Sequence, residues 1–284
     1  MTVLPDRSVR IAVVQAEAVP GEVAGNARTA ARLLRQAAGA GVRLAVLPEL
    51  FLPGYHPPVL SADPAGCDVA AAAGDVVDDP RLDPIRVVCR ECGVIALVGA
   101  SVRRPDGGRY CSTLLADTSG SITAAYDKQH LCGSDERDLF QPGTTGATIE
   151  LDPWRFGLGI CYDGCFPEHA RAAALAGAHG YLCPTAYVVG SEHRRDLYYA
   201  ARALDNTFFV GVANLVGGDG EWRFNGGSTI YDPQGRPLRR AADAGEAVVA
   251  ADLDPGLLAE TRARQTMLAD RFEQPATRRH LTVA

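Results

Sequence analysis

The sequence contains no hydrophobic run long enough for a membrane span and no excess of basic charge. No stretch reaches the roughly 18 consecutive apolar residues that a transmembrane helix needs. The first residues, MTVLPDRSVRIAVVQAEA, hold a short apolar run interrupted by Gln15 and Glu17, so we expect no signal peptide. The 28 basic residues are scattered among 34 acidic ones, and the formal net charge is −6. We therefore expect a cytoplasmic enzyme, with neither a membrane nor a nucleic acid as partner.

Linkers and low-complexity tracts are also missing, so residues 1–284 are expected to form one domain, with two domains as the alternative. Eight cysteines occur in this long chain without secretory features, and we expect reduced thiols. Cys89 and Cys92 have zinc-like spacing, but no second Cys or His pair lies at a matching distance. We therefore interpret them as one face of a helix and expect no metal.

Hydrophobic periodicity predicts strands alternating with helices in an α/β protein, followed by a run of strands. Asn26 is placed as a possible cap of the first helix. Helices are expected over 27–38, 84–93, 167–178 and 192–206. Strands are expected over 10–18, 42–49, 94–102, 110–117, 121–128, 147–152, 156–163, 180–186, 207–217, 226–237 and 246–254. So many strands exceed a comfortable single sheet, which favours two packed sheets with helices outside.

Three reactive side chains stand at the ends of predicted strands. Glu49 ends the strand in LAVLPELFLPGY, Lys128 the one in AYDKQHL, and Cys161 the one in FGLGICYD. Active-site groups of α/β sheets gather at strand ends, because the loops there can converge. Taken singly, each has a plain structural interpretation: a loop charge, a solvated lysine and a small buried thiol.

Together, a carboxylate, an ammonium and a thiol suit nucleophilic catalysis. A free thiol has a pKa near 8.5, so only about 3% is thiolate at pH 7. A neighbouring ammonium such as that of Lys128 is expected to lower this pKa, and a carboxylate such as Glu49 can accept the proton. The ammonium can also stabilise the oxyanion of a tetrahedral intermediate, and the backbone N–H of Tyr162 would be a second donor to it.

LPELFLPGY, YDKQHL and GICYDGCFPE, in this order and spacing, resemble the nitrilase superfamily of carbon–nitrogen hydrolases, and the resemblance spans nearly the whole chain. It implies an α-β-β-α sandwich, that is, four layers with two mixed sheets inside. It also implies Glu49 as general base, Lys128 as oxyanion and positioning residue, and Cys161 as nucleophile. Glu136 matches a second glutamate of amidase-type members. The sequence departs from the family at Asp205, where a glutamate is expected.

The resemblance further implies pairing across the cysteine-bearing helix, so a homodimer or larger homo-oligomer is expected. Aromatic residues near the site are candidates for the substrate pocket: Tyr55, Phe166 and Tyr187. Cys165 competes with Cys161 but lacks its strand lead-in, and His130 is expected to make a loop hydrogen bond rather than to act in catalysis. Two other histidines are expected at a helix surface and a helix end: His169 and His179.

Tyr162–Asp163 follows the cysteine where nitrile-hydrolysing relatives usually have Trp-Glu, so the resemblance favours an amide hydrolase. The substrate is expected to be a small aliphatic amide, cleaved through a cysteine thioester without a cofactor. The first alternative is hydrolysis of an N-carbamoyl amine or N-carbamoyl amino acid. A nitrilase, an acyltransferase and a catalytically silent binding protein are less favoured, the last because Glu49, Lys128 and Cys161 are all present.

Overall fold

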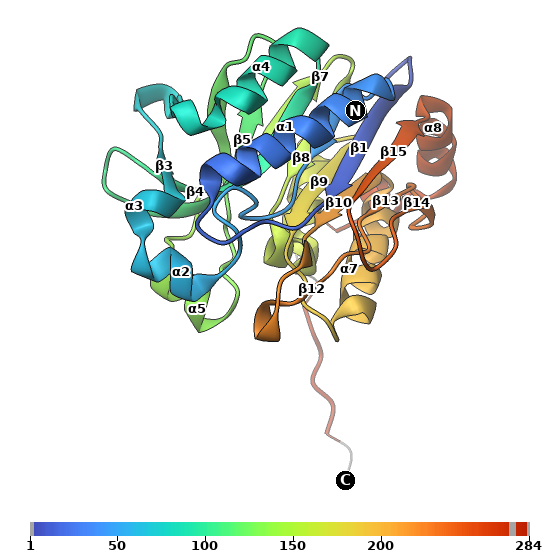
Figure 1. Cartoon of the computed structure of the whole chain (residues 1–284). Helices are drawn as coiled ribbons and strands as arrows, with labels where there is room; N and C mark the ends of the chain where they lie inside the picture. Colours follow the sequence, from blue (N-terminus) through green and yellow to red (C-terminus); the bar gives the residue numbers. More distant parts are fainter. Residues whose placement is uncertain (1–2, 273–276, 283–284) are drawn as a thin grey trace.

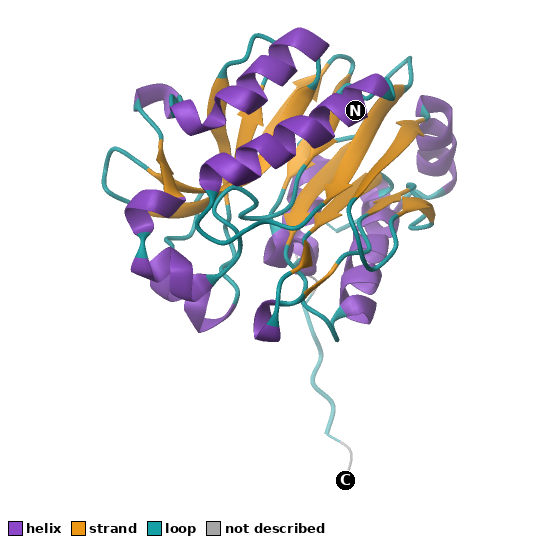
Figure 2. Ribbon diagram, in the orientation of Figure 1, coloured by secondary structure: helices purple, strands orange, loops and turns teal. Residues whose placement is uncertain are grey.

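The computed structural model describes residues 3–272 and 277–282. Within these ranges the chain forms two large mixed sheets and one small one (Figures 1 and 2). The first has the order β15 (Ala247–Leu253), β1 (Val9–Gln15), β2 (Leu44–Val46), β4 (Ile95–Arg103), β5 (Arg109–Ala116), β6 (Ile122–Asp127), with β3 (Asp68–Ala70) beside β4. The second has the order β14 (Pro237–Arg240), β13 (Thr229–Tyr231), β10 (Phe209–Asn214), β9 (Gly180–Thr185), β8 (Trp154–Leu158), β7 (Thr148–Leu151). The small sheet pairs β11 (Val216–Gly217) with β12 (Phe224–Asn225).

Helices cover the outer faces of both large sheets. Figure 1 shows α1 (Val23–Gly39) and α4 (Asp83–Cys92) across the first sheet, and packing contacts place α6 (Pro167–Leu175) and α7 (Glu192–Asn206) against the second. Shorter helices lie at the edges: α2 (Pro57–Ala62), α3 (Pro64–Cys67), α5 (Gly133–Leu139), α8 (Pro255–Arg264) and α9 (Met267–Asp270). None of the helices among the described residues is long and apolar enough to span a membrane.

Alternating side chains of the central strands fill the three spaces between these four layers. In β1, Ala12 and Val14 face the helices while Ile11 and Val13 face the second sheet. Gly211 in β10 brings the sheets close, since a Cβ there would lie 3.2 Å from Val13. A strand with both faces buried reads as a continuous apolar run, as β1 does. The predicted α-β-β-α sandwich is confirmed.

Several element boundaries differ from those predicted. Asn26 does not cap α1, because the helix starts three residues earlier; its side chain instead bonds both backbone groups of Val19 and the Leu52 carbonyl. The predicted strand over 156–163 ends at Leu158, and Cys161 opens a 3₁₀ turn. Five helices were not predicted: α2, α3, α5, α8 and α9. Four of them have only four to seven residues, which is too short for a recognisable periodicity. The fifth, α8, has ten residues but buries only Leu258 and Thr261, so no apolar stripe marks it.

Candidate active site

Glu49, Lys128 and Glu136 form one buried ion-pair cluster. The Lys128 Nζ lies 2.6 Å from Glu49 Oε1 and 2.7 Å from each oxygen of Glu136. The three side chains are 0%, 0% and 2% exposed, so their charges are compensated by one another rather than by water. Glu136 also accepts hydrogen bonds from the Tyr55 hydroxyl at 2.7 Å and from the Cys132 N–H at 2.8 Å. The lysine therefore has a fixed position.

A tight backbone approach places Glu49. The chain leaves β2 and crosses β4 at Gly99, where a Cβ would lie 2.2 Å from the Pro48 carbonyl oxygen. Leu50, the next residue after Glu49, has a left-handed φ of 46°, and the Leu52 N–H donates to the Gly99 carbonyl at 3.0 Å. Glycine at this point of β4 is thus required for the turn that delivers the carboxylate.

The turn that carries Cys161 is held in a strained conformation. Cys161 has a φ of 45°, which a non-glycine residue adopts only when its surroundings enforce it. The Tyr199 hydroxyl donates to the Cys161 carbonyl at 2.8 Å. On either side, Gly159 and Gly164 leave room for aromatic rings, since a Cβ would lie 1.8 Å from the Tyr181 hydroxyl and 2.4 Å from the Tyr199 ring, respectively.

Asp163 ties this turn to the segment after Lys128, a link that the sequence analysis missed. Its buried carboxylate accepts from the Ile160 N–H at 3.0 Å, the Tyr126 hydroxyl at 2.8 Å and the His130 N–H at 2.9 Å. The His130 Nδ1 lies 2.8 Å from the same carboxylate. An acidic residue inside an otherwise apolar strand-to-helix turn was the available signal, because a buried carboxylate needs several donors.

Burial dominates the electrostatics of the cluster. It raises the pKa of Glu49 to about 7; Lys128 and the Cys161 thiol act against that shift, and Glu136 adds to it. Burial lowers the pKa of Lys128, but the two carboxylates outweigh it and the pKa stays well above its ordinary value. Lys128 therefore remains a cation, and Glu49 exchanges a proton near neutral pH.

The pKa of Cys161 lies well above its ordinary value, and here the expectation of a lowered pKa was wrong. Burial and the Glu49 carboxylate raise this pKa by more than Lys128 and the Ala186 N–H lower it. The resting cysteine is thus a thiol beside a carboxylate that can accept its proton, rather than a preformed thiolate.

The aromatic candidates lie around this cluster in different ways. Tyr55 touches it through Glu136, and its ring packs against Trp222 at 5.7 Å. The Tyr187 hydroxyl lies 3.3 Å from the Cys165 sulfur. Phe166 stacks on the His130 ring at 4.0 Å. Its ring also meets the half-buried ring of Tyr162, edge to face at 5.0 Å.

A cavity of about 420 Å³ opens beside Tyr55 and is lined by aromatic side chains together with carboxylates, among them His56, Trp222, Phe224, Glu17 and Asp219. A larger hollow of about 640 Å³ lies between β6 and residues 142–147 and contains none of the predicted site residues. Of these two hollows, the 420 Å³ cavity is the one lined by a predicted site residue, Tyr55, whose hydroxyl bonds Glu136 of the ion-pair cluster.

Other predicted residues have structural surroundings. His169 is not at a free helix surface but bonds the Tyr126 hydroxyl at 2.8 Å and the Tyr181 hydroxyl at 2.9 Å. His179 is buried and accepts from the Arg155 N–H at 3.1 Å. Asp205 lies 3.8 Å from Arg202 within α7, far in sequence from the cluster.

The cysteines do not indicate a metal site. Cys89 and Cys92 both lie in α4, the first buried and the second exposed. All eight cysteines belong to the described part of the chain, and none is paired in a disulfide there. No group of three or more His, Cys, Asp or Glu side chains within residues 3–272 and 277–282 has the geometry to hold a metal ion.

The chain is similar to known proteins in both sequence and structure. The family model described as carbon-nitrogen hydrolase matches residues 10–263. A hydrolase from the pqqF 5' region of Pseudomonas protegens is 35% identical over 93% of this chain and 90% of its own length. Human omega-amidase NIT2 is 29% identical over 90% of this chain and 92% of its own.

Solved structures of an amidase from Nesterenkonia sp. AN1 are also similar. The complex of a variant of that amidase with acrylamide has a TM-score of 0.78 and 28% identity, and the match covers 95% of this chain and 96% of the amidase. Another of its structures, with a TM-score of 0.78 and 29% identity over 95% and 97% of the two chains, has the acetamide moiety of fluoroacetamide added covalently at the active-site cysteine. The present chain belongs to the carbon–nitrogen hydrolase family, within the nitrilase superfamily, and is a carbon–nitrogen hydrolase.

Proposed function

We propose that this enzyme hydrolyses a small aliphatic amide to the acid and ammonia, with Cys161 as nucleophile, Glu49 as general base and Lys128 as oxyanion donor. The observation that carries the proposal is the buried cluster of Lys128 with Glu49 and Glu136, in which Glu49 also neighbours the Cys161 thiol. A base that titrates near pH 7 beside an un-ionised thiol is suited to general-base catalysis at neutral pH.

In the first half-reaction the Cys161 sulfur bonds to the carbonyl carbon while Glu49 takes the thiol proton. The carbonyl oxygen becomes an oxyanion that accepts from the Lys128 ammonium and from the Tyr162 N–H, which follows Cys161 at the start of its turn. Collapse of this intermediate breaks the C–N bond, and the leaving nitrogen receives the proton from Glu49. Ammonia leaves and an acyl thioester remains on Cys161.

In the second half-reaction Glu49 takes a proton from water, which attacks the thioester carbon. The second oxyanion uses the same two donors, and its collapse returns the proton to the sulfur and releases the acid. Glu136 does not exchange protons in this scheme; by holding Lys128 with both oxygens it keeps the ammonium where the oxyanion forms. The acyl group would occupy the cavity beside Tyr55, with Phe166 and Tyr187 on the cysteine side.

The experiment is an ammonia-release assay over a series of short amides, N-carbamoyl compounds and nitriles. An amidase releases ammonia and acid from the amides, whereas a carbamoylase also releases carbon dioxide. Cys161→Ala should abolish turnover with the fold retained, and the neighbouring Cys165→Ala serves as the matched control that keeps it. Near wild-type turnover by Cys161→Ala would disprove the nucleophile assignment.

We also propose that residues 1–284 act as one domain and that the enzyme is a homodimer or larger homo-oligomer. Support for association comes from exposed leucines on the outer helices, where Leu175, Leu197 and Leu204 are 50%, 67% and 40% exposed. Light scattering of Leu197→Glu, with wild type as reference, should show a smaller species; an unchanged monomer in both would refute the association. The cytoplasmic location stays a prediction.

A further inference from the structure

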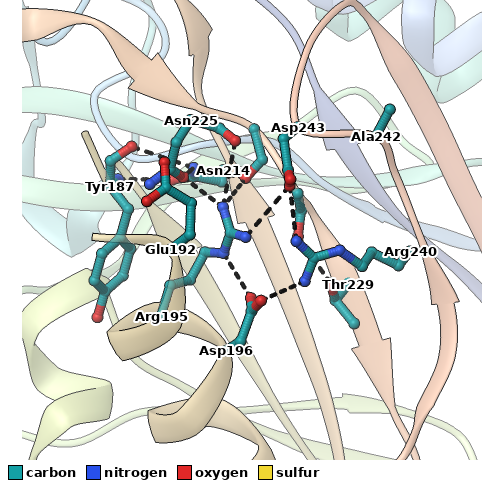
Figure 3. A network of polar contacts seen from close by, with 12 residues as sticks. Tyr187, Glu192, Arg195, Asp196, Asn214, Asn225, Thr229, Arg240, Ala242 and Asp243 are labelled. Carbon is teal, nitrogen blue, oxygen red and sulfur yellow. Dashed lines mark hydrogen bonds and ion pairs between the residues drawn. The ribbon is translucent and has the colours of Figure 1, made fainter. Parts of the chain in front are cut away.

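Arg195, in α7, is a buried arginine. Its side chain is 1% exposed and lies below the loop that joins the small sheet to β13 (Figure 3). Its Nε donates to Asp196 at 2.9 Å, and its Nη1 donates to the Asn225 side chain and, at 2.5 Å, to the Gly226 carbonyl. Burying a guanidinium is costly, so a residue of this kind needs a reason beyond filling space.

Charge balance alone does not give that reason. Asp196 and Asp243, which lie beside Arg195, are both also paired with Arg240, at 2.6 and 2.7 Å. These two carboxylates would thus keep a cationic partner without Arg195. Besides these ion pairs, Arg195 donates to the Asn225 side chain and the Gly226 carbonyl of the glycine-rich loop, two acceptors that also receive the side-chain amide of Asn214. A rigid fork of donors is suited to hold a carboxylate and this loop at the same time.

The loop is shaped to receive the guanidinium. Gly226 and Gly227 have left-handed φ values of 56° and 68°, and a Cβ on Gly227 would lie 2.3 Å from the Arg195 Nη2. The backbone therefore lies directly on the guanidinium, and Gly227 leaves the space for it, whereas a Cβ on Gly226 would meet the Gln15 side chain at 2.8 Å. Arg195 fixes the position of Asn225, the residue just before them.

Asn225 in turn is hydrogen-bonded to the segment of residues 186–188. Its N–H donates to the Tyr187 carbonyl at 3.0 Å, and its side-chain amide donates to the Val188 carbonyl at 2.6 Å. Asn214 completes the link: it donates to the Asn225 side chain at 2.9 Å and accepts from the Tyr187 N–H at 2.7 Å. Figure 3 shows these side chains as one connected network between Arg195 and Tyr187.

The Tyr187 side chain of this segment borders the turn Cys161–Cys165, which we call the cysteine turn. The Tyr187 hydroxyl lies 3.3 Å from the Cys165 sulfur, and its ring packs edge-on against Tyr199 at 6.1 Å. Tyr199 in turn donates to the Cys161 carbonyl at 2.8 Å. A chain of direct contacts thus runs from Arg195 to the wall of the site without Arg195 touching any reacting group.

We propose that Arg195 is a positioning residue that acts through Asn225 and Asn214 to hold the Tyr187 segment (residues 186–188) against the cysteine turn, so that the substrate pocket has its shape before substrate binds. The catalytic part of this inference rests on the proposed amide hydrolysis. The loss of Arg195 should therefore weaken substrate binding more than the chemical step, because Glu49, Lys128 and Cys161 keep their own contacts.

Arg195→Lys is the first test variant, because a single ammonium cannot reach Asp196 and the loop together. Asn225→Ala removes the side chain that connects Arg195 to residues 186–188, and it is the deciding variant if Arg195→Lys does not fold. Each should lower kcat/KM for short amides at least tenfold, with the loss mainly in KM. The double variant should fall no more than threefold below the worse single variant, since both act on one segment. Arg240 pairs with the same two carboxylates as Arg195 but does not contact the loop, so Arg240→Met should keep kcat/KM within threefold of wild type.

Hydrogen–deuterium exchange of the peptide covering residues 186–191 tests the link without relying on activity. It should speed up at least tenfold in both single variants and remain as in wild type in Arg240→Met. Unchanged exchange, or kcat/KM within threefold of wild type in folded Arg195→Lys and Asn225→Ala, would overturn the inference, as would a loss confined to kcat. If the wild-type enzyme releases no ammonia from amides, the proposed function fails, and exchange alone decides the role of Arg195.

Discussion

Replacing Glu136 by glutamine should move the pH dependence of the enzyme to lower pH as well as slow it. Glu49 and Glu136 contact the same Lys128 Nζ at 2.6 and 2.7 Å, so their nearest oxygens are at most about 5.3 Å apart. At an effective dielectric constant near 20, two like charges at that distance repel by roughly 3 kcal/mol, or about two pKa units. Glu136 thereby raises the pKa of Glu49, which is about 7 in the intact cluster.

The substitution removes this repulsion and leaves the Lys128 charge to Glu49 alone, so the pKa of Glu49 should fall. Because Glu49 accepts protons only when ionised, kcat/KM in wild type should rise with pH up to about 7 and then level off. In Glu136→Gln this limb should move down by about one to two pH units. The value of kcat should also fall, because an amide nitrogen replaces one of the three oxygens that accept from Lys128 and the second ion pair of the lysine is lost.

The assay is kcat/KM for ammonia release from a short amide between pH 4.5 and 9. Asp135→Asn is the matched control, since Asp135 is the exposed neighbour on the same helix, α5, and its loss should leave the profile unchanged. A limb that stays near pH 7 in Glu136→Gln, or that moves upward, would refute the coupling between the two carboxylates.

Three further substitutions test how the site is held. Asp163→Asn should lower the free energy of unfolding by about 2–3 kcal/mol, or the melting temperature by roughly 3–5 °C, because the NH₂ group of the amide would face buried N–H and O–H donors. An unchanged calorimetric melt would contradict its role. Tyr199→Phe should cost about 1 kcal/mol and lower kcat up to roughly tenfold by releasing the Cys161 carbonyl, and wild-type kcat would show that this bond does not position the thiol. Gly99→Ala should destabilise the fold by about 1–3 kcal/mol, because the new methyl group meets the Pro48 carbonyl; a urea midpoint equal to that of wild type would exclude the clash.

The sequence predicted the long elements well and their ends less well. The helix over 192–206 has the predicted bounds because apolar residues recur along it and a buried strand follows. The strand that leads to Cys161 ends earlier than predicted, because apolar residues continue through Ile160 while the backbone already turns. Hydrophobicity reports burial, and burial does not distinguish a strand from a tightly packed turn.

The sequence likewise identified only part of the site. Glu49, Lys128 and Glu136 could be named because motifs marked them, and the structure brings them within hydrogen-bonding distance. Asp163 lies inside the motif GICYDGCFPE, but its partners Tyr126 and His130 are 37 and 33 residues away, so the motif did not reveal its role. Arg195 belongs to no quoted motif, and its partners Asn225 and Asp243 are 30 and 48 residues away. Nor could the raised pKa of Cys161 be foreseen, since it depends on the depth of burial, which outweighs the charge of the lysine.

The most direct test of the account is the mass of the peptide that carries Cys161 after acid quenching during turnover of a short amide. We predict that this peptide gains the acyl group of the substrate, that hydroxylamine removes it, and that Glu49→Gln changes how much accumulates. An acyl group found on another residue, or steady turnover with no acyl group on Cys161 and undiminished activity in Cys161→Ala, would contradict it.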